Sequence, residues 1–285
     1  MERVLSIALV HPPRLPLPAL SVARTASLAG QLVPGARLVA EETAVAFTYN
    51  GTSHAVMMAT PADLEDFAAG LSLTEGMVGT VDDISDLAIV GTDLGIELRM
   101  WICDTHMRSY TARRRISAGP TGCGLCGVES LSEASRPARR VGAGLRVAPE
   151  TISTAMAALS PAQMLHRGTR AVHAAAFWQP RKGIVAIRED VGRHNALDKL
   201  VGALARRRID GGSGIVLLTS RVSVEMVQKT AVLGASILVA VSAPTALAVR
   251  VAEACGMTLV AIARGQDFEI FSHPKRVAPI ARKSS

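Results

Sequence analysis

The hydrophobic and polar positions in the first third of the chain follow a pattern of short strands. Strand-like segments at residues 43–49 and 53–58 flank Asn50-Gly51, a pair that strongly favours a β-hairpin. Further strands are predicted within residues 84–100. With one helix between them, these segments predict a small α+β domain.

That helix is predicted to begin at Pro61, with Thr60 as its N-cap. Proline suits the first helical position because its missing amide hydrogen would have no partner there. Apolar residues then continue at helical spacing, at Leu64, Phe67, Ala68 and Leu71.

From about residue 160 the pattern changes to short apolar strands that alternate with amphipathic helices. The predicted strands are residues 183–187, 215–218, 237–241, 259–262 and 268–271, and the predicted helices are residues 195–208, 222–233 and 244–255. Gly256 is placed to end the last of these helices. This alternation predicts an α/β domain with a parallel sheet that is covered by helices on both faces.

Three segments follow from these patterns. Residues 1–35 are rich in proline and lack periodicity, so we expect a poorly structured lead-in. Residues 36–118 form the predicted α+β domain, and residues 119–285 form the α/β domain. A stretch rich in charge and helix breakers around Arg113-Arg114-Arg115 separates the two.

Composition narrows the class of protein. Of 285 residues 49% are apolar and 3% aromatic, which predicts a folded chain with a core of small aliphatic side chains. The net charge of +7 is compatible with an anionic partner and equally with a merely basic surface. We expect no nucleic-acid partner, because base stacking needs aromatic side chains. Apolar runs are too short for a membrane span or a signal peptide, and four cysteines do not suggest a disulfide scaffold, so we expect a cytoplasmic location.

Polar residues follow several of the predicted strands. Ligands of open α/β sheets bind beyond the carboxyl ends of the strands, where hydroxyls, arginines and helix amides can hold phosphate groups. Candidate ligand-binding residues are therefore Thr219, Ser220, Arg221, Ser242, Arg264, Gly265 and Gln266. The alternative is that the serines and threonines are ordinary helix caps.

Residues 122–127 read Gly-Cys-Gly-Leu-Cys-Gly and hold half of the cysteines of the chain. Such a pair suits metal ligation, dithiol exchange or a persulfide-bearing cysteine. We expect no metal, because a closed zinc site needs four ligands, and a zinc deaminase needs a glutamate where His173 is followed by two alanines. The glycines favour a mobile loop over the helix of a thioredoxin-like motif.

A second dense motif runs from Arg188 to Lys199. Acid/base pairing around Asp190 and His194 is one interpretation of it. A helix cap with surface ion pairs is the other, and spacing alone does not decide between them.

Five stretches together resemble the formate dehydrogenase accessory sulfurtransferase family, FdhD. They are Tyr49-Asn50-Gly51, Thr60 to Glu65 running on to Glu75-Gly76, Cys123 to Gly127, Glu189 to Lys199, and Thr219-Ser220-Arg221 through Ala263-Arg264-Gly265. The resemblance implies a cytidine-deaminase-like α/β domain at residues 119–285, without deaminase chemistry, and a homodimer.

The resemblance also implies an activity. A cysteine desulfurase would load sulfur onto Cys123, with Cys126 as its partner, and the carrier would supply that sulfur to the bis-molybdopterin guanine dinucleotide molybdenum cofactor of formate dehydrogenase. That cofactor would bind transiently, with GDP as a mimic, and no cofactor would be held permanently. The matching cofactor segment is Ile262, Ala263, Arg264, Gly265, Gln266 and Asp267.

Two departures from the family pattern stand out. Residues 169–172 read Thr-Arg-Ala-Val where a Gly-Gly is expected, and Asp267 stands where a neutral or basic residue would suit phosphates. The principal alternative function is a chaperone that binds the molybdenum cofactor without moving sulfur. Paired thiols favour transfer, since a protein that only holds the cofactor needs none.

Overall fold

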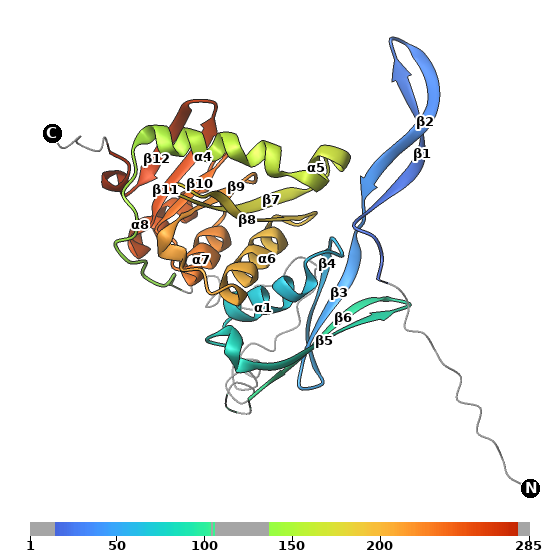
Figure 1. Cartoon of the computed structure of the whole chain (residues 1–285), viewed down its shortest axis with the longest axis horizontal. Helices are drawn as coiled ribbons and strands as arrows, with labels where there is room; N and C mark the ends of the chain where they lie inside the picture. Colours follow the sequence, from blue (N-terminus) through green and yellow to red (C-terminus); the bar gives the residue numbers. More distant parts are fainter. Residues whose placement is uncertain (1–14, 104, 106–136, 279–285) are drawn as a thin grey trace, which may run out of the picture.

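The structure, a computed structural model, describes residues 15–103, 105 and 137–278 (Figure 1). These residues form a mixed α/β fold with sheets of two, four and six strands. Cys123 and Cys126 lie outside the described residues.

The four-stranded sheet has the order β4-β3-β6-β5. Its strands are β3 (Thr43–Tyr49), β4 (Thr52–Ala59), β5 (Ile84–Thr92) and β6 (Gly95–Ile102). The predicted hairpin is confirmed, because β3 pairs antiparallel with β4 and both turn residues, Asn50 and Gly51, have positive φ angles, 48° and 78°. The Asn50 amide also exchanges two hydrogen bonds of 2.8 Å with the backbone of Ile102, which ties the turn to β6.

The predicted start of the first helix is wrong by three residues. Helix α1 (Leu64–Thr74) has Asp63 at its N-cap position, with φ 52° and no side-chain cap. Thr60 does not cap it, because its hydroxyl accepts a hydrogen bond from the amide of Val191, far along the chain (3.1 Å). A tertiary contact has therefore replaced the local cap.

The six-stranded sheet has the order β12-β11-β10-β9-β7-β8. Its strands are β7 (His173–Gln179), β8 (Gly183–Asp190), β9 (Ile215–Leu218), β10 (Ile237–Ala240), β11 (Thr258–Arg264) and β12 (Asp267–Ser272). Only β9, β10 and β11 are mutually parallel, while β7 and β12 run antiparallel to their neighbours. The expectation of a parallel sheet is thus corrected, because the turns β7–β8 and β11–β12 are too short for parallel crossovers.

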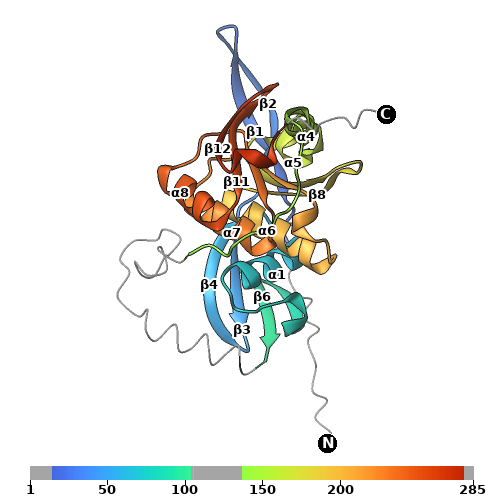
Figure 2. The same cartoon turned by 90° about the vertical axis from the view of Figure 1, so that its left-hand side faces the viewer.

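Helices cover both faces of this sheet, as predicted (Figures 1 and 2). On one face lie α4 (Pro149–Ala162) and α5 (Met164–Thr169); on the other lie α6 (Arg193–Arg206), α7 (Val224–Leu233) and α8 (Ala246–Cys255). Gly256 ends α8 in the left-handed region (φ 80°), which confirms that prediction. Below α6 and α7, helix α1 separates them from the four-stranded sheet.

The expectation of a poorly structured lead-in over residues 1–35 is wrong in part. Residues 19–40 form a β-hairpin of β1 (Ala19–Leu28) and β2 (Gln31–Ala40), which projects away from the rest of the molecule (Figure 1). The expectation for residues 19–35 is therefore corrected, whereas residues 1–14 lie outside the described part. Pro34 fits this hairpin because both strands have a free outer edge. The remaining domain limits, and a cytidine-deaminase-like second domain, stay predictions.

Candidate functional site

The carboxyl ends of β9, β10 and β11 meet at one edge of the six-stranded sheet, because these three strands are parallel. The segments that follow them are hydrogen-bonded to one another. Val222 donates to the carbonyl of Ala243 (3.2 Å), and the amide of Ile262 donates to the carbonyl of Ser242 (3.3 Å). The structure therefore brings the sequence-predicted ligand residues after these strands together, as expected for such a sheet.

The hydroxyls at this edge have internal partners. Thr219 accepts a hydrogen bond from the amide of Ala174 on β7 (2.9 Å), and Ser220 is buried and donates to the carbonyl of Arg221 (3.0 Å). Thr245, at the start of α8, is an ordinary N-cap that accepts from Ala248 (3.2 Å). Structural hydrogen bonds within the fold are therefore enough to explain these three hydroxyls.

The arginines at the edge remain exposed. Arg221 is exposed directly after β9, and Arg264 is exposed at the end of β11, where its Nε donates to the carbonyl of Val241 at the end of β10 (3.4 Å). Two guanidinium groups at one edge can bind an anion.

The segment from Ile262 to Asp267 is irregular backbone at the same edge. Ile262 has φ 53° and lies within a register shift between β11 and β12. Arg264, Gly265, Gln266 and Asp267 form the exposed turn that follows. A bulge of this kind interrupts the strand pairing and bends the strand locally.

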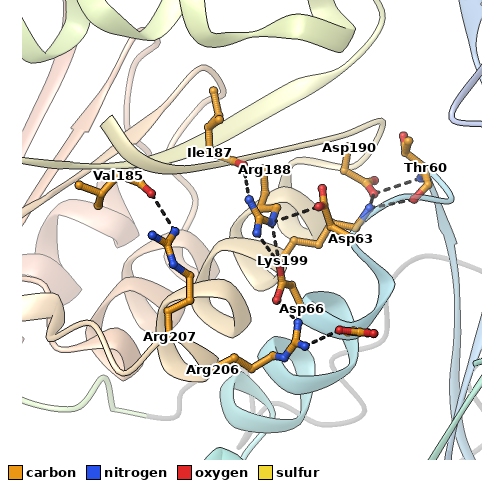
Figure 3. Close-up of polar contacts among 11 residues, drawn as sticks. Thr60, Asp63, Asp66, Val185, Ile187, Arg188, Asp190, Lys199, Arg206 and Arg207 are labelled. Carbon is orange, nitrogen blue, oxygen red and sulfur yellow. Dashed lines mark hydrogen bonds and ion pairs between the residues drawn. The ribbon is translucent and has the colours of Figure 1, made fainter. Parts of the chain in front are cut away.

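The motif from Arg188 to Lys199 joins the two halves of the molecule. Asp190 is fully buried and does not pair with His194 (Figure 3). Its Oδ2 accepts from the Nζ of Lys199 (2.6 Å) and from the amide of Thr60 (3.1 Å), and Lys199 also donates to the carbonyl of Thr60 (2.8 Å). Burial lowers the pKa of Lys199, and the charge of Asp190 opposes this shift. Asp190 therefore forms a buried ion pair with Lys199 and is not the acid/base partner of His194.

Two further ionic contacts reinforce that junction. Arg188 and Arg206 both donate to the carboxylate of Asp66 on α1, at 2.5 and 2.6 Å (Figure 3). On the other side of α6, both carboxylate oxygens of Asp198 accept from Lys229 on α7, at 2.7 and 2.8 Å. Sequence reasoning missed this pair, although a lysine on the apolar face of a helix was a visible signal.

Of the two cysteines within the described part, Cys255 is in a poor environment for a reactive thiol. Cys103 is exposed and Cys255 is buried, and burial raises the pKa of the Cys255 thiol, which disfavours the nucleophilic thiolate. Within the described ranges, no group of three or more histidine, cysteine or acidic side chains is arranged to hold a metal ion. Nor does any helix there have the length and hydropathy to cross a membrane.

A mixed sheet with helices on both faces and basic side chains at the carboxyl ends of its parallel strands defines an α/β protein. The family model described as the FdhD/NarQ family matches residues 40–278. The chain belongs to this family.

Curated relatives agree with that assignment. The chain is 51% identical over 257 residues to sulfur carrier protein FdhD of Agrobacterium fabrum, covering 90% of this chain and 95% of the relative. It is 50% identical over 242 residues to the protein of the same name from Brucella abortus biovar 1, covering 85% and 90%. A solved structure of a candidate formate dehydrogenase accessory protein from Desulfotalea psychrophila has the same fold, with a TM-score of 0.72 and 24% identity over 92% of this chain and all of that one.

Proposed function

We propose that this chain is a sulfur carrier, a sulfurtransferase that serves a formate dehydrogenase. The observation that carries the proposal is its likeness, along most of its length, to proteins named sulfur carrier protein FdhD, in a sequence that contains Cys123 and Cys126 with two residues between them. The chemistry needs reduced thiols, so we propose that it takes place in the cytoplasm.

In the proposed loading step, the thiolate of Cys123 attacks the outer sulfur of a persulfide on a cysteine desulfurase. A new S–S bond forms on Cys123, the S–S bond of the donor breaks, and the donor cysteine leaves as a thiolate. The step exchanges one persulfide for another, so it needs no external oxidant or reductant. Cys126 can then attack the inner sulfur of this persulfide, which forms a Cys123–Cys126 disulfide and releases the outer sulfur as sulfide to the acceptor; a cellular dithiol reductant then has to reopen the disulfide.

The acceptor in this proposal is the bis-molybdopterin guanine dinucleotide molybdenum cofactor, bound transiently as a substrate. The exposed guanidinium groups of Arg221 and Arg264 would hold its phosphates, beside the segment from Ile262 to Asp267. The buried hydroxyl of Ser220 is a weaker candidate than its position in the sequence suggested. GDP is the corresponding probe.

We also propose that the carrier is a homodimer. The face of the β1–β2 hairpin that carries Leu20, Val22, Leu28 and Val33 has exposed apolar side chains and projects from the body of the molecule. A two-stranded hairpin alone is marginally stable in water, so this face needs a permanent cover. A second copy of the chain is always present to provide one, whereas a client enzyme is not.

The function is tested by loading and activation in one preparation. We expect incubation with a cysteine desulfurase and cysteine to add the mass of one sulfur to the wild-type chain and to Cys103→Ala, but not to Cys123→Ala. Cys123→Ala should also fail to activate formate dehydrogenase. If Cys123→Ala activates the enzyme fully, the chain is a cofactor-binding chaperone and not a sulfur carrier.

A further inference from the structure

Arg193, in the first turn of α6, differs from the arginines at positions 188 and 206 in its surroundings. Arg188 and Arg206 both share the carboxylate of Asp66. Arg193 is partly buried, its Nε is enclosed without a hydrogen-bond partner, and it makes no ion pair with any residue that the structure describes. An enclosed guanidinium nitrogen without a hydrogen-bond partner is costly, so an anion is expected to supply the missing partner.

Two histidines lie beside this guanidinium. His173 begins β7 opposite Asp190, and burial, followed by the nearby charge of Arg193, lowers its pKa. His194 follows Arg193 on α6, and its enclosed Nε2 lies 3.8 Å from a carboxylate oxygen of Glu225. Three nitrogen-bearing side chains from two elements therefore lie together at the edge of the sheet.

The carboxylates nearby are already engaged. Asp190 accepts hydrogen bonds on both oxygens, from Lys199 and Thr60 on Oδ2 and from Gly192 and Asn195 on Oδ1. Glu225 on α7 accepts from the hydroxyl of Ser223 (2.6 Å) and lies 3.8 Å from His194, whose interaction lowers the pKa of Glu225 to about 2. Neither carboxylate contacts Arg193, so its positive charge is left over.

Backbone geometry adds to the positive potential here. Helix α6 follows Gly192 and helix α7 follows Ser223, and neither helix has a side-chain hydrogen bond at its N-cap. The positive end of the helix dipole at each of these starts favours an anion. These starts lie at the edge where Thr219, after β9, is hydrogen-bonded to Ala174 on β7.

We propose that Arg193, His173 and His194 form a binding site for a phosphate-type oxyanion at the start of α6. The planar guanidinium fork matches the oxygens of such a group, and the imidazoles can add single hydrogen bonds. The anion is either a phosphate of a nucleotide, as in the proposed function on which that source rests, or free inorganic phosphate. Nothing in the sequence patterns singled out Arg193, because its lack of a partner is a tertiary property.

Titration calorimetry of the full chain with inorganic phosphate, GDP and guanosine tests this site, at constant ionic strength set with chloride. We expect Arg193→Gln to weaken phosphate and GDP binding by roughly tenfold or more, the loss expected for a hydrogen bond to a charged group. Guanosine binding should not change. Arg207→Gln is the matched control, because it removes the same charge from the other end of α6, where Arg207 only contacts the carbonyl of Val185.

The outcomes separate this site from the proposed function. Phosphate binding that Arg193→Gln does not weaken, or no phosphate binding by the wild-type chain, would overturn the site. If GDP binds and Arg193→Gln leaves that binding unchanged, the site is also wrong but the nucleotide cofactor stands. Phosphate binding at Arg193 without GDP binding supports the site and counts against the nucleotide. Arg193→Lys, which retains the charge but not the fork, should bind phosphate with intermediate affinity and guards against misfolding of the glutamine variant.

Discussion

Lys199 is a lysine with no exposed side-chain surface, and its charge is matched by Asp190. Together with Thr60 and Asn195, this pair holds the chain just before α1 against the start of α6. The same contacts fix the turn that presents Arg193 and His194 at the sheet edge. The motif therefore positions the proposed anion site without itself being the acid/base pair that its composition allowed.

Replacing Lys199 with Met should destabilise the protein by about 3–5 kcal/mol, because Asp190 would keep a buried charge without its partner. Urea unfolding followed by circular dichroism measures this loss. Asp190→Asn combined with Lys199→Met should be less destabilised than Lys199→Met alone, since no unpaired charge remains. Lys275→Met, at an exposed lysine, should behave like wild type. A Lys199→Met variant within about 1 kcal/mol of wild type would show that the ion pair contributes little, as many exposed pairs do.

At the scale of elements, helices α1 and α6 cross with their backbones in contact. A Cβ atom built at Gly70 would lie 1.7 Å from the carbonyl oxygen of Asp198, and one at Gly202 would lie 1.9 Å from that of Asp66. The two glycines are what allow this approach, which in turn brings Asp66 within reach of Arg188 and Arg206. The junction between the two halves of the chain therefore depends on the two glycines and on the ionic contacts of Asp66.

Gly202→Ala should therefore destabilise the protein by about 1–3 kcal/mol or more, because the helices must separate to admit the methyl group. The sign of this change in the free energy of unfolding is informative, because alanine in an ordinary helix interior would stabilise the helix relative to glycine. Thermal unfolding measures the change. Gly142→Ala is the control, because a Cβ atom there meets nothing within 4 Å. A Gly202→Ala variant more stable than wild type would contradict the close crossing.

The whole molecule stacks α4, the six-stranded sheet, the helices α6 to α8, helix α1 and the four-stranded sheet, with the β1–β2 hairpin outside this stack (Figures 1 and 2). Each of these layers packs against the next through buried side chains. The hairpin has only limited contacts with the body, chiefly with α5. Its exposed apolar residues are the place where we propose that a second copy binds.

Light scattering of the purified chain should give the mass of two copies. Val22→Glu combined with Val33→Glu should give the mass of one copy, because both charges would enter the proposed apolar contact. Ser21→Glu combined with Thr25→Glu places the same charges on the opposite face of the hairpin and should remain dimeric. A monomeric wild-type chain, or a Val22→Glu, Val33→Glu variant that stays dimeric, would refute the proposed role of this face.

Local signals in the sequence determined many of the strands, helices and turns of this protein. The alternation of apolar strands and amphipathic helices, the Asn50-Gly51 turn and the end of α8 at Gly256 each depend on residues a few positions apart, so short-range physics fixes them. The edge after β9, β10 and β11 was predictable for the same reason, because it follows from strand order and direction once the strands are parallel. The thiol pair was visible as a motif, and its role stays a prediction.

Only the tertiary structure decided the functions of individual polar residues. Thr60 and Asp190 are 130 positions apart, and Thr60 and Lys199 are 139 apart, so no local pattern could show that a predicted helix cap serves a buried ion pair. The β1–β2 hairpin was missed because the prolines before it and Pro34 within it concealed the strand pattern. Strand β7 was not predicted, and the antiparallel strand β12 was not distinguished from a parallel one. The missing partner of Arg193 became visible only when every neighbouring carboxylate had been located, since charge balance is a property of neighbours in space.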